Sequence, residues 1–299
     1  MKIIKYAAID IGSNAVRVLI SNILSKKNKP TIYVKSSIVR VPIRLGQDSF
    51  TVGEISKTNI KKLFKTLRAF KLLMKIHGVE KYMVCATSAL REANNSEFIV
   101  KKIKDKLNIK IQIIDGRKEA EIISYSDIFN YNNLNLSKNF IYIDVGGGST
   151  EFTVLKDKKR ISSKSFKIGT VRMINGTVNS KIWIDIKCWI KENTSEIKNL
   201  VVLGSGGNIN KIFKIAKIKD GNPISILKLN TIYENLKKLS YDDRIYNYNL
   251  NTDRADVILP ALEIFIKSLK WSGSNKVFVP KIGLSDGMIK MLHKKLSKN

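Results

Sequence analysis

Histidine and cysteine are both scarce in this chain. Its 299 residues contain two histidines and two cysteines. The histidines, His77 and His293, flank the ends of predicted helices, where a structural or solvent-facing role is expected. A metal site built on imidazole, or chemistry through phosphohistidine, is therefore not expected. The cysteines, Cys85 and Cys188, lie far apart in apolar segments and form no CxxC pair, which predicts two buried thiols in a reducing compartment.

Long apolar runs are also missing. Asp10 interrupts the first apolar stretch, so no signal peptide is expected, and no stretch approaches the roughly 20 residues that span a membrane. These two absences predict a cytoplasmic protein without a membrane partner.

Acidic residues are few compared with basic ones. The chain has 25 Asp and Glu against 54 Lys and Arg, which gives a formal net charge of +29. This excess suits a polyanionic partner, because dense positive charge raises the local concentration of anions. It consists mostly of lysine spread over the whole chain, however, as compositional drift in an A/T-rich genome would produce. Clustered arginines interleaved with aromatics are lacking, so no nucleic-acid partner is expected.

The hydrophobic periodicity divides the chain into two halves of the same order. In the first half, strands are expected at residues 5–11, 15–23, 31–41, 81–86 and 109–114, and helices at 55–76, 87–107 and 117–129. In the second half, strands are expected at 139–144, 151–156, 160–167, 200–203 and 276–279, and helices within 169–198, 207–217, 228–239, 252–271 and from 285 onward. This order predicts an α/β protein with a duplicated unit, in domains 1–130 and 131–299. The final helix could pack back on the first domain.

A run of three glycines follows a predicted buried strand in the second half. The phosphate-binding candidates of this stretch are Gly146, Gly147, Gly148, Ser149 and Thr150. Backbone N–H groups without a Cβ can close around an anion, and the hydroxyls can add donors. Asp144 and Glu151 flank the run, and carboxylates so close to a phosphate need a cation between them, for which Mg²⁺ is suited. For this stretch alone, a glycine-rich hairpin turn is the alternative.

The first half repeats this pattern. Asp10 ends a predicted strand and is followed by Gly12, Ser13 and Asn14. Two such hairpins facing each other would hold one phosphate chain in a cleft between the domains. Asp10 could instead only anchor the turn through its side chain. A third glycine cluster, residues 204–207, lies where a strand is expected to become a helix, and a helix N-terminus can bind anions.

These motifs together resemble the exopolyphosphatase and guanosine pentaphosphate phosphohydrolase (Ppx/GppA) family in its short two-domain form, within the actin, Hsp70 and sugar-kinase superfamily. The resemblance spans nearly the whole chain, and five stretches carry it in the family's order: residues 8–14, 86–93, 114–120, 143–151 and 204–207. It implies two duplicated actin-like, ribonuclease H-like domains with a phosphate-binding cleft between them.

The resemblance also implies an activity and the roles of individual residues. The expected reaction is hydrolysis of a terminal phosphoanhydride, in inorganic polyphosphate or at the 5′ end of pppGpp. Glu119 is expected to be the catalytic base, and Asp144, Glu151 and Asp10 are expected to hold Mg²⁺. The phosphate contacts are expected from Arg91, Arg254, Gly206 and Gly207 in addition to the two hairpin loops.

Several alternatives stay open at this point. Glu119 and Glu121 both lie at the start of a predicted helix, where acidic residues stabilise the helix dipole in any case. Arg91 could pair with Glu92 or Glu97 on its own helix. The same superfamily contains ATP-dependent small-molecule kinases, and a non-catalytic sensor of polyphosphate or guanosine polyphosphates is a further alternative.

The sequence is silent on some properties. It does not separate polyphosphate from pppGpp, and a homodimer stays open. Longer members of the family carry a helical domain of the HD type, which these residues lack, so high processivity on long polyphosphate is not expected.

Overall fold

The computed structural model describes residues 1–126, 139–157 and 159–297. The chain forms two compact units, each with its own hydrophobic core. Unit 1 comprises Met1–Ser126 and Leu284–Asn299, and unit 2 comprises Asp127–Gly283. The last helix therefore belongs to the first unit, although the whole of unit 2 separates the two segments in sequence.

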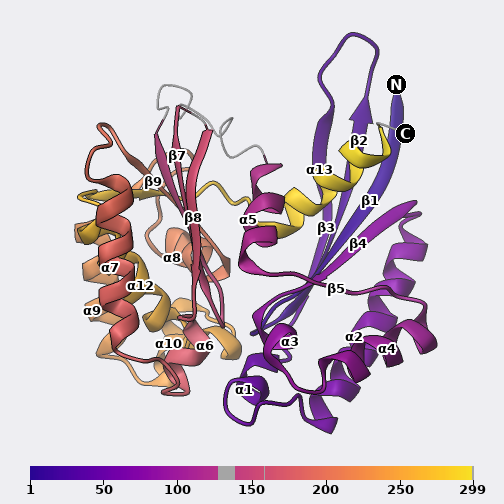
Figure 1. The fold of residues 1–299 in the computed structure, drawn as a ribbon, viewed down its shortest axis with the longest axis horizontal. Coiled ribbons are helices and arrows are strands. Elements are labelled where there is room, and N and C mark those ends of the chain that lie inside the picture. The colour runs from indigo at the N-terminus through magenta and orange to yellow at the C-terminus, as the bar shows by residue number, and fades with distance from the viewer. Residues whose placement is uncertain (127–138, 158, 298–299) are drawn as a thin grey trace. The chain divides into compact units, whose positions relative to one another are not determined.

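Unit 1 contains a mixed sheet with the strand order β3-β2-β1-β4-β5 (Figure 1). The first three strands pair antiparallel, while β4 runs parallel to β1 and β5 parallel to β4. The strands are β1 (Lys2–Ile11), β2 (Val16–Ser25), β3 (Ile32–Val41), β4 (Lys81–Ala86) and β5 (Gln112–Ile113). β1 is buried on both faces from Tyr6 onward, which explains why residues 6–9 form a continuous apolar run.

One face of this sheet packs against α2 (Lys57–Ile76), whose apolar residues recur at a spacing of three and four. Ser56 accepts a hydrogen bond from the Asn59 N–H at its start, and Gly78 follows its end with a φ of +68°, which favours glycine. The other helices of the first segment are α1 (Leu45–Ser49), α3 (Ser88–Glu92), α4 (Ser96–Leu107) and α5 (Gly116–Ser124).

Helix α13 (Leu284–Leu296) completes unit 1. It lies against β1, β4 and α5 (Figure 1, yellow). Gly287 allows the close approach to α5, because a Cβ there would collide with the carbonyl oxygen of Ile122. His293 packs edge-on against Tyr6 and Tyr33, and its Nδ1 is 2.8 Å from the Tyr33 hydroxyl. Burial lowers the pKa of His293, as a structural role would predict.

Unit 2 repeats the same sheet with one strand added. Its order is β10-β11-β9-β6-β7-β8, with β6, β7 and β8 antiparallel and β9 parallel to β6. The strands are β6 (Phe140–Val145), β7 (Thr150–Lys156), β8 (Lys159–Phe166), β9 (Val201–Ser205), β10 (Ile224–Ser225) and β11 (Lys276–Phe278). The helices are α6 (Thr170–Ile174), α7 (Lys181–Thr194), α8 (Gly207–Ile215), α9 (Ile226–Lys237), α10 (Tyr241–Tyr248), α11 (Thr252–Ala255) and α12 (Ile258–Trp271).

The matching sheets confirm the predicted α/β class with a duplicated unit. The short elements α1, β10 and α10 were not predicted, and the helices expected at 87–107, 169–198 and 252–271 are each split in two. The helix expected at 117–129 ends at Ser124, and residues 127–129 lie outside the described part of the chain. None of the described helices is long and apolar enough to cross a membrane.

One prediction about the thiols is wrong. Cys85 is buried in the sheet of unit 1, but Cys188 is exposed on α7. The apolar residues around Cys188 belong to the helix face that packs on the core, whereas Cys188 lies on the opposite face.

Candidate active site

The hairpin β6–β7 of unit 2 carries two carboxylates at its turn. Asp144 and Glu151 are directly opposite each other in the antiparallel pair, so their side chains lie on the same face of the sheet. Glu151 is 3% exposed, and Asp144 is half-buried. The turn between them is closed by a hydrogen bond of 3.0 Å from the Gly146 N–H to the Ser149 carbonyl. Two neighbouring carboxylates on one face repel each other, and a cation between them would relieve that repulsion.

The hydroxyl groups of this turn are engaged within the protein. Ser149 Oγ donates to Glu151 Oε1 at 2.6 Å, and Ser165 Oγ of β8 donates to the same oxygen at 2.9 Å. Thr150 Oγ1 donates to the Ile168 carbonyl at 2.7 Å. The two hydroxyls predicted to bind phosphate thus orient Glu151 and anchor the strand, and an anion at this turn would depend on backbone N–H groups.

Helix α6 fixes the direction of those N–H groups. The Gly146 carbonyl accepts from the Thr170 N–H at 3.0 Å, the Gly147 carbonyl accepts from the Val171 N–H at 2.8 Å, and the Gly148 carbonyl accepts from Arg172 Nε at 2.6 Å. A trans peptide points its C=O and N–H in opposite directions. The N–H groups of Gly147, Gly148 and Ser149 therefore point away from α6, as an anion-binding loop requires.

The turn between β9 and α8 lies beside the end of β6. A Cβ on Gly206, which has a φ of +112°, would be 2.8 Å from the Val145 carbonyl oxygen and 3.4 Å from Asp144 Oδ1. Arg254 of α11 reaches the same turn, where its Nη1 donates to the Gly207 carbonyl. Unit 2 therefore brings Asp144, Glu151, the glycine loop and this turn with Arg254 to one end of its sheet.

The corresponding hairpin of unit 1, β1–β2, has a different charge pattern. Asp10 lies opposite Arg17, and Asp10 Oδ2 is 3.0 Å from Arg17 Nη2. Asp10 is 5% exposed, and burial raises its pKa above the ordinary value, although Arg17 opposes the shift. The predicted metal ligand Asp10 thus already has a cation beside it.

The unit 1 loop is held as the unit 2 loop is. The Ser13 carbonyl accepts from the Gly46 N–H at 2.8 Å, and the Asn14 carbonyl accepts from the Arg44 N–H at 3.0 Å, so α1 holds the loop as α6 does in unit 2. The Gly12 N–H donates to the Ala15 carbonyl at 3.1 Å and closes the turn. The hydroxyls of Ser13 and Ser88 are 2.9 Å apart, which links the loop to the start of α3.

Arg91 joins α3 to the segment that precedes α5. Its Nη1 donates to the Ile114 carbonyl at 2.7 Å, just before Asp115, the N-cap residue of α5. Arg91 is partly exposed, so the guanidinium has further donors for an anion. Its bond to a distant carbonyl differs from the pairing with Glu92 or Glu97 that the sequence allowed.

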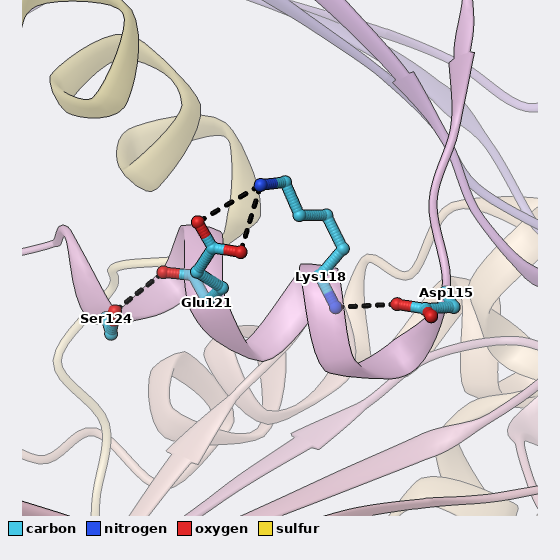
Figure 2. Close-up of polar contacts among 4 residues, drawn as sticks. All are labelled: Asp115, Lys118, Glu121 and Ser124. Atoms are coloured by element: carbon cyan, nitrogen blue, oxygen red, sulfur yellow. Dashed lines mark hydrogen bonds and ion pairs between the residues drawn. The ribbon is translucent and has the colours of Figure 1, made fainter. Parts of the chain in front are cut away.

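The two glutamates at the start of α5 have different environments. Glu121 is bound by Lys118, whose Nζ lies 3.0 and 2.9 Å from its two carboxylate oxygens (Figure 2). Asp115 caps the helix by accepting from the Lys118 N–H at 2.7 Å (Figure 2). Glu119, by contrast, is 8% exposed. The ion pair with Lys118 accounts for Glu121 on the surface, whereas stabilisation of the helix dipole by Glu119, in the first turn, does not require a buried carboxylate.

Asp10 and Glu119 both lie near enough to the buried thiol of Cys85 to affect its pKa. Cys85 is the neighbour of Asp10 in the parallel β1–β4 pair. Burial raises the pKa of the Cys85 thiol to about 12, and the charges of Asp10 and Glu119 contribute to the rise. Unit 1 thus brings together Asp10, Glu119 and the loop at residues 12–14, at the carboxyl ends of β1 and β4.

No cluster of three or more His, Cys, Asp or Glu residues with metal-binding geometry occurs in the part of the chain that the structure describes. A metal at the unit 2 hairpin would therefore take two protein carboxylates and fill its other positions with water and substrate oxygens. Mg²⁺ is commonly held in this way.

Five residues that hold the two loops in place were not predicted from the sequence. These residues are Arg17, Gly46, Ser165, Gly169 and Arg172. A Cβ on Gly169 would be 2.5 Å from the backbone of Gly147, and a Cβ on Gly46 would be 2.8 Å from Ser13 Cβ. A glycine soon after the third strand of each half was the available signal, because it recurs in both copies.

The chain is similar to a known protein family. The model of the Ppx/GppA phosphatase family matches residues 25–296. The bifunctional 3-dehydroquinate synthase/phosphatase of Fusobacterium nucleatum is 29% identical over 91% of this chain and 44% of its own length. Exopolyphosphatase 2 of Mycobacterium tuberculosis is 28% identical over 60% of this chain and 57% of its own length. The chain thus spans about half the length of these curated relatives.

Solved structures with the same fold cover the whole chain. The Ppx/GppA family member of Aquifex aeolicus has a TM-score of 0.76 at 23% identity and covers 100% of this chain and 99% of its own. An exopolyphosphatase of Cytophaga hutchinsonii has a TM-score of 0.82 at 20% identity and covers 97% of this chain and 98% of its own. At these identities the comparison establishes the fold alone.

Proposed function

Because this chain belongs to the Ppx/GppA phosphatase family, as its motifs predicted, we propose that it hydrolyses the terminal phosphoanhydride of inorganic polyphosphate or the 5′ phosphoanhydride of pppGpp. The observation that carries the proposal is the paired placement of Asp144 and Glu151 beside the glycine loop of unit 2. Two carboxylates on one face, next to outward-pointing N–H groups, suit a phosphate accompanied by a cation.

Mg²⁺ is the cation that fits this donor set best. Asp144 and Glu151 offer only oxygen ligands, and two serine hydroxyls already orient Glu151, as supporting residues do around metal-binding carboxylates. Bound there, Mg²⁺ would neutralise charge on the phosphate oxygens. Asp10 is a weaker candidate for a direct ligand, because Arg17 already neutralises it.

The chain's own residues supply the remaining chemistry in this proposal. Glu119 accepts a proton from the attacking water at a carboxylate oxygen, and a buried carboxylate is a stronger base than an exposed one. Arg91, Arg254 and the N–H groups of the two loops stabilise the negative charge that spreads over the phosphate oxygens in the loose transition state. Catalysis therefore depends on positioning and electrostatics in both units.

Phosphate release from short polyphosphate, long polyphosphate and pppGpp, with and without Mg²⁺, tests the proposal. Glu119→Gln is expected to lower kcat roughly 10²- to 10⁴-fold, because a general base contributes about that much. The matched control is Glu121→Gln, two residues along the same helix, which removes a surface ion pair and should keep kcat nearly unchanged.

The outcomes of this assay are distinct. Equal turnover in the Glu119→Gln and Glu121→Gln variants would refute the role of Glu119. Transfer of phosphate from ATP to a small hydroxyl compound, without polyphosphate hydrolysis, would identify a kinase. Tight binding of polyphosphate or guanosine polyphosphate without any phosphate release would identify a sensor. The relative rates on polyphosphate and pppGpp would settle the substrate.

A further inference from the structure

Unit 2 contains a cavity that none of the assigned motifs lines. It has a volume of about 750 Å³ and lies where α8, α9 and α10 end. Four of its ten lining residues are lysines, Lys211, Lys214, Lys217 and Lys238, and none of the ten is acidic. Asparagines, with Ile215, Leu239 and Tyr248, complete the lining.

The charge of this cavity is positive even after the helix ends are considered. Each of the three helix C-termini carries a partial charge of about −0.5, which together offset less than half of the four lysine charges. A lysine at a helix C-terminus also stabilises that helix, which explains Lys214 or Lys238 taken singly. It does not explain why cations from two different helices face one cavity that lacks a carboxylate.

The lysines repel one another in the absence of a ligand. Lys211 is half-buried, and its ammonium group donates to the Asn249 carbonyl at 2.8 Å. Burial lowers the pKa of Lys211, and the charges of Lys214 and Arg254 lower it further. An anion in the cavity would relieve this repulsion.

Helix α8 connects the Gly206–Gly207 turn, a predicted phosphate contact, with the cavity. Gly207, whose carbonyl binds Arg254, starts α8, and Lys211 follows one helical turn later, about 6 Å along the axis. Lys214 and Lys217 follow at intervals of three residues, so a line of cations leads from the Gly206–Gly207 turn to the far end of α8.

We propose that this lysine-lined cavity binds the distal phosphate groups of a polyphosphate chain whose terminal phosphate lies at the Gly206–Gly207 turn. This inference rests on the proposed function and identifies polyphosphate as the substrate that would contact residues along the whole of α8. A guanosine polyphosphate also carries linked phosphates, so the experiment compares the two ligands. A short substrate such as tripolyphosphate would reach no farther than Lys211, at the near end of the cavity, and would not contact Lys214 or Lys238.

Binding without turnover tests the inference directly. Affinities for long polyphosphate, tripolyphosphate and guanosine tetraphosphate would be measured by calorimetry without Mg²⁺, for the full chain. The variant Lys214→Glu/Lys238→Glu changes two exposed side chains, and the control Lys187→Glu/Lys191→Glu makes the same charge change on exposed positions of α7. We expect roughly tenfold weaker binding of long polyphosphate in the first variant, with tripolyphosphate unchanged, and little effect in the control.

Two outcomes of the binding measurements would overturn the inference. Equal losses in the cavity variant and the control would mean that only the overall charge matters. A loss confined to guanosine tetraphosphate would make the cavity a nucleotide site. If the wild type binds long polyphosphate but hydrolyses nothing, the proposed function fails, while the comparison of the two variants still decides the role of the cavity.

Discussion

The hairpins β1–β2 and β6–β7 have similar backbone hydrogen bonds but differ in the charge of the residue that lies opposite their aspartate. In both, a strand ends on an aspartate, a glycine N–H closes the turn, and a short helix holds the loop through its carbonyls. Opposite that aspartate, however, unit 1 has Arg17 and unit 2 has Glu151. The first hairpin pairs its aspartate with an arginine across the strands, while the second places two carboxylates opposite each other, and adjacent negative charges are stabilised by a nearby cation.

The difference shows how two copies of one fold can keep the same loop geometry and take different chemical roles. The turn geometry that presents N–H groups is retained in both copies, and in our proposal the residue opposite the aspartate determines whether the hairpin also binds a metal. In our proposal unit 2 therefore holds Mg²⁺, and unit 1 supplies the buried carboxylate Glu119 that acts on water.

The largest expected effect comes from removing the charge that distinguishes unit 2. Glu151→Gln should lower Mg²⁺-dependent phosphate release roughly 10²-fold or more, because a metal ligand is lost while the shape of the side chain is kept. Kinetics at several Mg²⁺ concentrations would measure it. Ser165→Ala, which removes only one of the two hydroxyls that orient Glu151, should cause a smaller loss. If Glu151→Gln retained its Mg²⁺ dependence, the assignment of the metal to this hairpin would be wrong.

The supports of the two loops should differ in their tolerance of a methyl group. A Cβ on Gly169 would meet the backbone of Gly147, whereas the nearest atom to a Cβ on Gly46 belongs to the ring of Phe50, which can move, although Ser13 Cβ at 2.8 Å would also have to shift. We expect Gly169→Ala to lower the free energy of unfolding by about 3 kcal/mol and Gly46→Ala by about 1 kcal/mol. Urea denaturation of both variants would measure the difference, and equal losses would contradict it.

A smaller effect than that of Gly169→Ala is expected from removing the cation of unit 1. Arg17→Met should lower the free energy of unfolding by about 1–2 kcal/mol at neutral pH, because buried Asp10 loses its partner while Arg17 itself is partly exposed. Burial already raises the pKa of Asp10, and without Arg17 it rises further. The difference in stability should be full above the pKa that Asp10 has in the variant and shrink as the pH falls from there to the wild-type pKa of Asp10. Below the wild-type pKa Asp10 is protonated in both proteins, and the difference should vanish.

Thiol labelling would show which unit this variant loosens. Cys85 lies beside Asp10, and its thiol is buried with a pKa of about 12, so it should react only when unit 1 opens. Cys188 on unit 2 is exposed and serves as the internal control. Arg17→Met should speed the labelling of Cys85 and leave Cys188 unchanged. A variant as stable as the wild type at neutral pH, with unchanged labelling of Cys85, would show that the ion pair does not contribute to the stability of unit 1.

The parts of the fold predicted from sequence were those set by local patterns. Continuous apolar runs located β1 and β6, and the spacing of three and four located α2. The two-residue strand β10 and the short helix α1 were not predicted, because elements of that length are too short to show a hydrophobic periodicity. Tertiary contacts create them, as in the bond from Gly46 to the Ser13 carbonyl.

The candidate site shows the same division. Glycine runs after strands located both loops, since their residue types carry the chemistry. The cross-strand register could not be predicted from the sequence, so Asp10 and Asp144 were both predicted to be metal ligands. In the structure Asp10 lies opposite Arg17, whereas Asp144 lies opposite Glu151. Burial was equally hidden, because Glu119 and Glu121 are two residues apart in sequence and only the packing of α5 separates them.

The membership of α13 in unit 1 has a consequence for how the protein is made. A ribosome synthesises β1 first and α13 only after the whole of unit 2, so the face of the unit 1 sheet that α13 covers stays bare throughout that time. Gly287 and His293, which seat the helix against α5 and the tyrosines, become available last. Unit 2 can close on its own during synthesis, whereas unit 1 must wait for its final helix, and an interrupted chain would leave the unit that carries Glu119 unfinished.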